Sequence, residues 1–112
     1  MARYQYVILS QSVAGEQEKF ERWYDEVHLA DVVKVPGVVS ARRFRVMSQV
    51  VDGLAAPAWC SLAIYEMETD DPEKVKRSIY RLSGSEAMPL SDALSMDGMI
   101  QLIVEPAGQV EK

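Results

Sequence analysis

The chain has 112 residues and a formal net charge of -5 at pH 7, which suits a single acidic domain spanning residues 1-112. Nucleic-acid binding is not expected, because neutralising phosphates needs clustered Lys and Arg, and the one basic cluster here, residues 42–45, is short. No apolar run is long enough to cross a membrane, and the N-terminus lacks the apolar core of a signal peptide, so we expect a cytoplasmic protein.

Metal and cofactor chemistry find no support in the residue inventory. The chain holds one histidine, His28, and one cysteine, Cys60, with none of the spacings of known metal sites. It has neither a Walker loop nor a dinucleotide-binding glycine pattern. A lone cysteine also precludes an intrachain disulfide. We therefore expect no metal and no bound cofactor.

The first third of the chain predicts a strand and then a helix. Residues 3–10 are rich in β-branched and aromatic side chains, as strands are. Over residues 15–34, apolar side chains recur at three- and four-residue spacing, which indicates a helix with one buried stripe. This stripe contains Phe20, Trp23, Tyr24 and Val27. Pro36 cannot continue the helix and Gly37 readily adopts turn dihedrals, so the chain should turn there.

The middle of the chain predicts two strands, over residues 38–50 and 58–68, joined by a hairpin-like turn at 52–57. Side chains alternate between the faces of a strand, and both faces of the second of these strands are apolar. We expect one set to face the helices and the other to point away. The first set is Cys60, Leu62 and Ile64, and the second is Trp59, Ala63 and Tyr65.

The last third predicts a helix, a connection and a strand. Asp71 is a good N-cap and Pro72 suits the first turn of a helix whose apolar stripe holds Val75 and Ile79. Residues 85–98 read as a connection, either a lid over a pocket or a plain link. Residues 99–106 predict the final strand, with Ile100, Leu102 and Val104 expected toward the helices.

The resulting order is β-α-β-β-α-β, which is the ferredoxin-like pattern of an α+β domain. Right-handed crossovers place both helices on one face of a four-stranded antiparallel sheet. The other face is left bare although it is not polar, and an apolar face needs a cover. A second copy of the sheet is the simplest cover, so we expect a homodimer with sheet packed on sheet.

The segment "FERWYDEVHLADVVKVPGVVSARRFRV" resembles the dimeric α/β-barrel superfamily, and within it the small EthD-like proteins. The matching positions are Phe20, Trp23, Tyr24, His28, Pro36, Gly37, Arg43 and Phe44. The resemblance implies the ferredoxin-like fold and the dimer. It leaves function open, because the superfamily includes monooxygenases, lactone isomerases, polyketide cyclases and haem-handling enzymes. With no second histidine, mechanisms that need two imidazoles cannot operate here.

His28 is the first candidate for a catalytic residue, because an imidazole can exchange a proton near neutral pH. Tyr24 precedes it by one helical turn, and Asp31 follows it by nearly one turn. Either Asp31 or Asp25 could hold the imidazole in one tautomer. The alternative is a structural histidine hydrogen-bonded near the end of its helix, where the helix dipole favours a cation.

Three further side chains are candidates for substrate binding. Tyr65, like Tyr24, carries a hydroxyl that needs a partner when buried and can offer it to a carbonyl or phenolate. Arg43 could bind a carboxylate or enolate through two hydrogen bonds, or could simply form a salt bridge. Trp23 could contact a ligand or belong entirely to the core.

These residues favour a cofactor-independent enzyme that moves a proton on a small aromatic, lactone or polyketide-like molecule. Isomerisation, cyclisation and lyase-type enolisation are the reactions of that kind. Two alternatives remain at this level. One is a cofactor-free monooxygenase whose electron-rich substrate itself activates oxygen. The other is a non-catalytic accessory protein that holds a small ligand in the same pocket.

Overall fold

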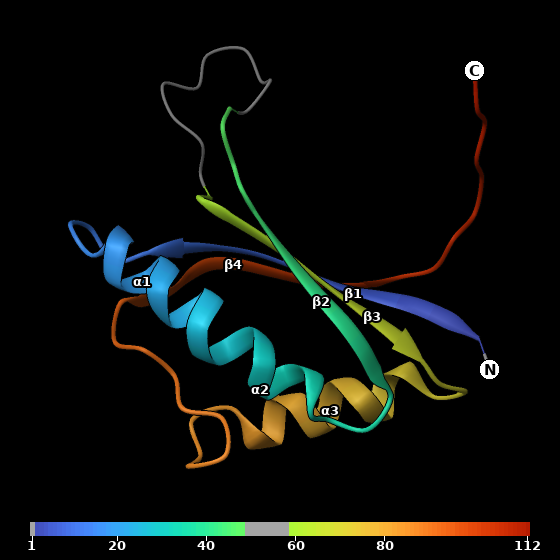
Figure 1. Cartoon of the computed structure of the whole chain (residues 1–112), viewed down its shortest axis with the longest axis horizontal. Helices are drawn as coiled ribbons and strands as arrows, with labels where there is room; N and C mark the ends of the chain where they lie inside the picture. The colour runs from blue at the N-terminus through green and yellow to red at the C-terminus, as the bar shows by residue number, and fades with distance from the viewer. Residues whose placement is uncertain (1, 49–58) are drawn as a thin grey trace.

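The computed structural model describes residues 2–48 and 59–112, and its four strands form one antiparallel sheet in the order β2-β3-β1-β4 (Figure 1). The strands are β1 (Arg3–Ser12), β2 (Val38–Arg45), β3 (Ser61–Glu68) and β4 (Leu94–Val104). The helical segments are α1 (Gln17–Trp23), η1 (Tyr24–His28), α2 (Leu29–Val33) and α3 (Pro72–Leu82). Both helical layers lie on one side of the sheet, which confirms the ferredoxin-like α+β arrangement.

The strand boundaries differ from those predicted at several places. β4 begins at Leu94 rather than at residue 99, because the end of β1 continues past a bulge and pairs Ser12 with Leu94. β2 already ends at Arg45, and β3 begins only at Ser61. The turn expected over 52–57 lies outside the described residues.

The sheet faces the helices with the set of side chains opposite to the one predicted. Ala63 and Tyr65 are fully buried in the same core as Phe20 of α1, whereas Leu62 and Ile64 are only partly buried. Strand pairing extends this reversal to β1 and β4, since Tyr6 lies opposite both Tyr65 and Ile103. Leu102 and Val104 accordingly lie on the outer face and are exposed. When both faces of a strand are apolar, the alternation of side chains does not show which face packs against the helices.

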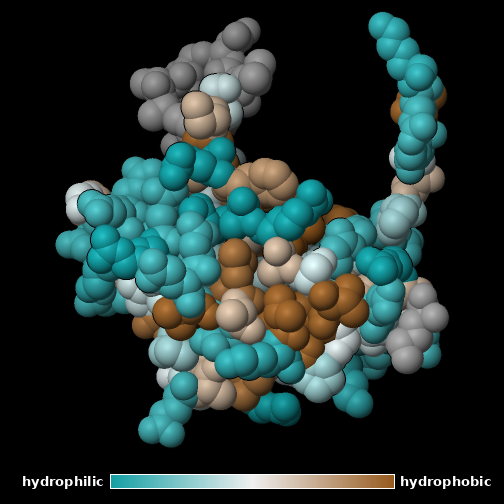
Figure 2. All heavy atoms as spheres, viewed as in Figure 1, coloured by the Kyte–Doolittle hydropathy of each residue, from teal (hydrophilic) through white to brown (hydrophobic). Residues whose placement is uncertain are grey.

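The outer face of the sheet remains apolar. Leu9 pairs with Leu62 and with Ile100, so their side chains share this face. Its apolar members are Val7, Leu9, Phe44, Leu62, Ile64, Ile100, Leu102 and Val104. Seen as in Figure 1, the surface is largely hydrophilic, with an apolar area between β2 and α3 (Figure 2).

A π-helical turn interrupts the first helix. The backbone N–H of Leu29 donates to the carbonyl of Tyr24, which is an i to i+5 hydrogen bond. This turn, η1, separates α1 from α2, so the single helix expected over 15–34 is a helix in three parts. π turns inside α-helices are rare and concentrate at functional sites. Both Tyr24 and His28 belong to this one.

The second helix follows its sequence signals closely. Asp71 caps α3 by accepting a hydrogen bond from the Lys74 N–H at 3.1 Å, and Pro72 opens the first turn. α3 also packs closely on the turn after α2. Gly37 there has φ +98°, and a Cβ at this position would lie 2.7 Å from Val75 Cγ2. Gly37 is thus needed both for its backbone angle and for its lack of a side chain.

Candidate active site

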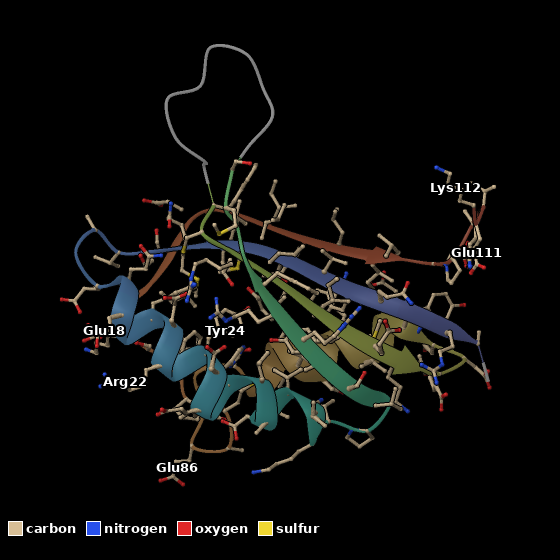
Figure 3. All side chains as sticks on the ribbon, turned by 45° about the horizontal axis from the view of Figure 1, so that its top comes forward. Glu18, Arg22, Tyr24, Glu86, Glu111 and Lys112 are labelled. Carbon is tan, nitrogen blue, oxygen red and sulfur yellow. The ribbon has the colours of Figure 1, made fainter. Side chains whose placement is uncertain are left out.

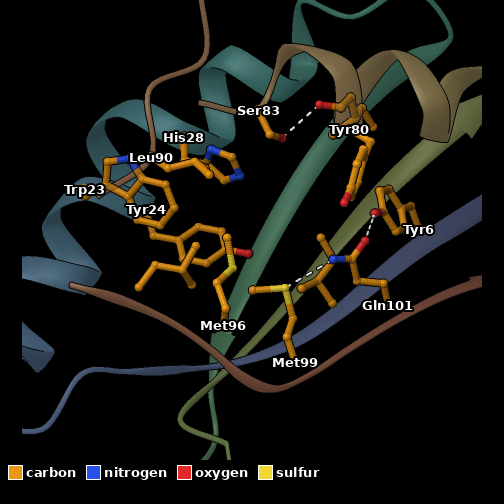
Figure 4. Close-up of a pocket in the computed structure, with 13 residues that line it drawn as sticks. Tyr6, Trp23, Tyr24, His28, Tyr80, Ser83, Leu90, Met96, Met99 and Gln101 are labelled. Carbon is orange, nitrogen blue, oxygen red and sulfur yellow. Dashed lines mark hydrogen bonds between the residues drawn. The ribbon is translucent and has the colours of Figure 1, made fainter. Parts of the chain in front are cut away.

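A cavity of about 440 Å³ lies between the helices and the sheet (Figure 4). Its lining comes from β1, α1, η1, α3, β4 and the connection before β4. The lining residues are Tyr6, Ile8, Trp23, Tyr24, His28, Ile79, Tyr80, Ser83, Leu90, Leu94, Met96, Met99 and Gln101. Apolar and aromatic side chains dominate, with a few polar groups among them, as in pockets for small organic molecules.

The π turn brings His28 into this cavity wall. The imidazole stacks on Trp23, with ring centroids 4.6 Å apart and planes at 27°, and meets Tyr24 edge-on at 5.3 Å. Residues five apart lie on different sides of a regular α-helix, so the wider π turn makes the stacking of Trp23 and His28 possible. The indole N–H of Trp23 donates to the Pro89 carbonyl at 3.0 Å, which fixes the position of the indole on which the imidazole stacks.

His28 is buried, neutral and unpartnered. Only 7% of the residue is exposed, and its Nδ1 has no hydrogen-bond partner among the described residues. Burial lowers the pKa of His28 to about 4, and the nearby charge of Asp31 opposes this only in part. At neutral pH the imidazole is therefore the free base. A buried polar atom without a partner is costly, so its presence in the cavity wall calls for an explanation.

The two carboxylates expected to orient His28 pair with other side chains in this structure. Asp31 lies 3.6 Å from Lys34 Nζ and reaches His28 only through its charge. Asp25 accepts two hydrogen bonds from Arg43, at 2.6 and 2.9 Å. The unpartnered Nδ1 of His28 shows that neither carboxylate binds that atom here. The imidazole is held by ring packing rather than by a carboxylate.

Tyr24 separates the cavity from a second buried polar cluster. Burial raises the pKa of Tyr24, and the hydroxyls of Tyr65 and Ser10, followed by the Arg43 guanidinium, act in the opposite direction. Tyr65 is fully buried and does not line the cavity, so it adjoins the site through Tyr24. The buried hydroxyl oxygens of Ser10 and Tyr65 form no hydrogen bond of standard geometry within the described residues, although both lie close enough to Tyr24 to lower its pKa.

Arg43 belongs to an ion-pair network on the far side of Tyr24. Its guanidinium lies over the Tyr24 ring, 5.7 Å from the centroid, and binds Asp25, Glu21 and, at 3.4 Å, Ser61 Oγ. Figure 3 shows Tyr24 between the first helix and the sheet. Arg43 does not line the cavity, which contrasts with the expectation that it binds substrate.

The opposite wall carries a polar pair that sequence patterns alone do not bring together. The Tyr6 hydroxyl donates to Gln101 Oε1, and Gln101 Nε2 donates to Met99 Sδ at 3.2 Å (Figure 4). Tyr6 and Gln101 lie 95 positions apart, and only the pairing of β1 with β4 brings them together. Alternation within the predicted last strand was the one available signal, since it groups Met99 with Gln101.

The connection before β4 closes one side of the cavity. Leu90 lines it, while Met88 is 1% exposed and accepts a contact from Ser83 Oγ at 3.6 Å. Lys19 of α1 forms an ion pair with Asp92, which ties this connection to the first helix. Such ties show a packed wall of the cavity in this conformation.

The described part of the chain has neither a metal-binding group of side chains nor a membrane-spanning helix. No group of three or more His, Cys, Asp or Glu side chains there is placed to hold a metal ion. No helix among these residues is long and apolar enough to cross a membrane.

No protein-family model matches the chain, and no curated protein sequence matches it. Solved structures do. An ethyl tert-butyl ether D (EthD) family protein from Bacillus halodurans matches with a TM-score of 0.63 and 16% identity, covering 94% of this chain and 99% of that one. A proposed monooxygenase from Shewanella loihica gives a TM-score of 0.61 and 12% identity, covering 96% and 97%. At such identities the likeness defines the fold.

A third solved structure describes that fold in words. It is a DABB family protein with a ferredoxin-like fold from Mesorhizobium loti, with a TM-score of 0.55 and 10% identity over 96% of this chain and 100% of that one. The class defined by fold and site is thus a ferredoxin-like α+β domain with a helix-to-sheet cavity. Within that class, the chain has the fold of an EthD-like protein.

Proposed function

We propose that this protein is a cofactor-independent enzyme that moves a proton on a small aromatic, lactone or polyketide-like molecule bound in the cavity. The observation that carries the proposal is the free-base His28 in the cavity wall, with a buried Nδ1 that lacks a partner. A structural histidine would be expected to make a hydrogen bond with the protein. A largely apolar cavity beside it supplies space for a reacting molecule.

In the proposed reaction, His28 takes a proton from a carbon next to a substrate carbonyl and returns it at another position. A base with a pKa of about 4 is weak, so the substrate must be an acidic carbon compound such as a β-dicarbonyl or an unsaturated lactone. Protonation of His28 is helped by the charge of Asp31, which raises its pKa. Tyr24 adjoins His28 in the lining and would stabilise the enolate oxygen, with Tyr65 behind it.

Deuterium exchange tests this chemistry without a known substrate. The protein is incubated in D2O with benzoylacetone, a butenolide and an aryl ketone, and exchange at carbon is followed by NMR. We expect faster exchange than in buffer for at least one compound, and a loss of about 10²- to 10⁴-fold in His28→Asn. Arg22→Gln is the matched control, because Arg22 pairs with Glu18 on the outer side of α1.

Equal rates with protein and with buffer across all three compounds would count against the proposal, as would full activity in His28→Asn. Circular dichroism of the variant separates lost chemistry from lost folding. The binding of a compound without exchange would instead favour a ligand-holding accessory protein.

A cofactor-free monooxygenase is the second candidate, and the fold likeness to the proposed monooxygenase from Shewanella loihica favours it. In that reaction the substrate donates electrons to oxygen, and His28 deprotonates the substrate first. An oxygen electrode separates the candidates, because proton transfer alone consumes no oxygen. Oxygen uptake that depends on both substrate and His28 would select the monooxygenase.

We also propose that two copies assemble through the outer face of the sheet. This face carries eight apolar side chains, and Phe44 and Leu102 on it are 44% and 48% exposed in the single chain. Exposed apolar patches of this kind mark interaction sites. Ultracentrifugation at micromolar concentration should give a dimer, and Ile64→Glu should give a monomer. A monomeric native protein would contradict the proposal.

A further inference from the structure

A second hollow adjoins the cavity on the side of α3. Its volume is about 560 Å³, and it is lined by Lys76, Arg77, Tyr80, Arg81 and Gln101. Tyr80 and Gln101 also line the cavity beside His28, so the two spaces share a wall. Figure 4 shows Tyr80 and Tyr6 converging on Gln101 at this wall. A ligand in the cavity can therefore extend past Tyr80 toward α3.

The shared opening is cationic although the protein is acidic overall. Three cationic side chains line the hollow on α3, and no Asp or Glu of the described residues lines either space, whereas the whole chain has a net charge of -5. Lys76 is engaged by Glu73 at 2.8 Å. None of the ion pairs found within residues 2–48 and 59–112 includes Arg77 or Arg81, so their charges are available.

The helix dipole accounts for part of this charge and leaves part unexplained. A cation in the last turn of a helix is favoured by the partial negative charge there, which suffices for Arg81. Arg77 lies one turn earlier, yet it faces the same hollow. Two arginines four residues apart present their guanidinium groups on one helix face, which suits the oxygens of a single anionic group.

The wall between the two spaces also presents hydrogen-bond donors. The Tyr6 hydroxyl donates to Gln101 Oε1, and this turns the amide nitrogen of Gln101 away from Tyr6. That nitrogen reaches Met99 Sδ, which is a weak acceptor, and leaves donor capacity for a ligand oxygen. Burial raises the pKa of Tyr6 to about 12, so its hydroxyl stays a donor and the amide keeps this orientation.

We propose that the cavity binds an organic anion, with its apolar body beside Trp23 and His28 and its carboxylate or phosphate on Arg77 and Arg81. The proposal rests on the proposed function of the cavity as the substrate site, and it adds the charge class of the substrate. Guanidinium groups bind carboxylates and phosphates through paired hydrogen bonds, and a neutral isostere gains none of this.

Calorimetric titration with three naphthalene compounds of similar shape tests the inference. The probes are 2-naphthoate, 2-naphthyl phosphate and the neutral 2-naphthamide. We expect the better anion to bind at least about tenfold more tightly than the amide, with an advantage that shrinks as salt rises. The comparison of naphthoate with naphthyl phosphate shows which acidic group the site prefers.

The double variant Arg77→Gln/Arg81→Gln should bind the anions no better than the amide, while its affinity for the amide stays unchanged. Arg22→Gln, on the outer side of α1, is the matched control and should bind like the native protein. Equal affinity for anion and amide, no binding of any probe, or an unchanged double variant would each overturn the inference. So would inorganic phosphate binding as tightly as naphthyl phosphate, because the cavity would then contribute nothing.

The two proposals fail in different experiments. His28→Asn should lose deuterium exchange yet keep the preference for the anion over the amide. Loss of that preference in the arginine variant, with no exchange by the native protein, would leave an anion-binding protein without the proposed chemistry. Exchange with no charge preference would leave the enzyme and remove the inference.

Discussion

His28 and Arg43 lie on opposite sides of Tyr24, and they differ in how their polar atoms are partnered. Arg43 binds two carboxylates and a serine hydroxyl, and its side chain is 7% exposed. His28 is buried to the same degree, yet its Nδ1 has no partner among the described residues. One side is a closed network of charges, and the other is a neutral ring next to a cavity.

This contrast separates a structural role from a chemical one. The partners of Arg43 consume its donors, so little remains for a substrate. The vacant atom of His28 costs folding free energy that a well-packed apolar ring would not cost. Natural proteins keep such groups where function needs them. Changing each side should therefore affect stability and activity in opposite proportions.

The largest expected effect is a loss of stability at low pH that arises from His28. The pKa of His28 is about 4 in the folded chain and 6.5 without the fold, so the unfolded chain takes up its proton first as pH falls. The contribution of His28 to the free energy of unfolding is therefore constant above about pH 6.5. It falls by about 3 kcal/mol as the pH drops toward 4. Urea unfolding at a series of pH values measures it, and the difference between native protein and His28→Phe isolates this group from the carboxylates. An identical pH dependence in both proteins would refute the buried, neutral histidine.

Removing the Arg43 guanidinium from the ion-pair network should lower the free energy of unfolding somewhat less. Arg43→Met removes the cation between Asp25 and Glu21, and we expect a loss of about 2 kcal/mol. The loss lies below that of a fully buried pair, because Asp25 is half exposed and can be hydrated. Urea unfolding at pH 7 gives the value. Binding of 2-naphthoate to the folded variant should be unchanged, and weakened binding would restore Arg43 as a substrate contact.

Replacing His28 by an apolar ring should leave stability nearly unchanged or increase it slightly. In His28→Phe a ring of similar shape still stacks on Trp23, and the unpartnered nitrogen disappears. We expect a change within about 1 kcal/mol, toward greater stability, at pH 7. Thermal unfolding together with the deuterium-exchange assay checks both halves. A strongly destabilised variant would reveal a partner for Nδ1.

The smallest effect should come from the outer member of the charged network. Arg45 binds Glu21 at 2.8 Å, but its side chain is 59% exposed. Exposed ion pairs contribute little, and Arg43 still binds Glu21 when Arg45 is changed. Arg45→Gln should leave the urea midpoint at pH 7 unchanged. A shift as large as that of Arg43→Met would mean that the network acts as one unit.

Local patterns were enough to predict the fold, because periodicity indicates the type of each element and both helical layers carry a start or stop signal. Asp71 and Pro72 open α3, and Pro36 and Gly37 end the first helical layer. The face of the sheet was predicted wrongly because both faces are apolar. What decides it is distant in sequence: Arg43 meets Glu21 and Asp25, and Tyr65 adjoins Tyr24.

The candidate site could be predicted only where it lies on one helix. His28, Tyr24 and Trp23 do line the cavity together, and helical spacing had already grouped the first two. Their stacking geometry depends on a π turn, which has no simple sequence pattern. The opposite wall, with Tyr6, Gln101 and the arginines of α3, depends on strand pairing and packing across the chain.

The π turn also settles a geometric conflict within the first helical layer. Phe20 and Val32 are both fully buried, yet twelve residues of regular α-helix would place them about 120° apart around the axis. If η1 takes up one extra residue, the remaining eleven bring them to within about 20°. The turn thus acts as a phase correction that lets both ends of the layer face one core. By the same count, deleting the extra residue would leave a regular α-helix whose two ends still face the core, so the fold should tolerate this deletion better than an insertion at the same place.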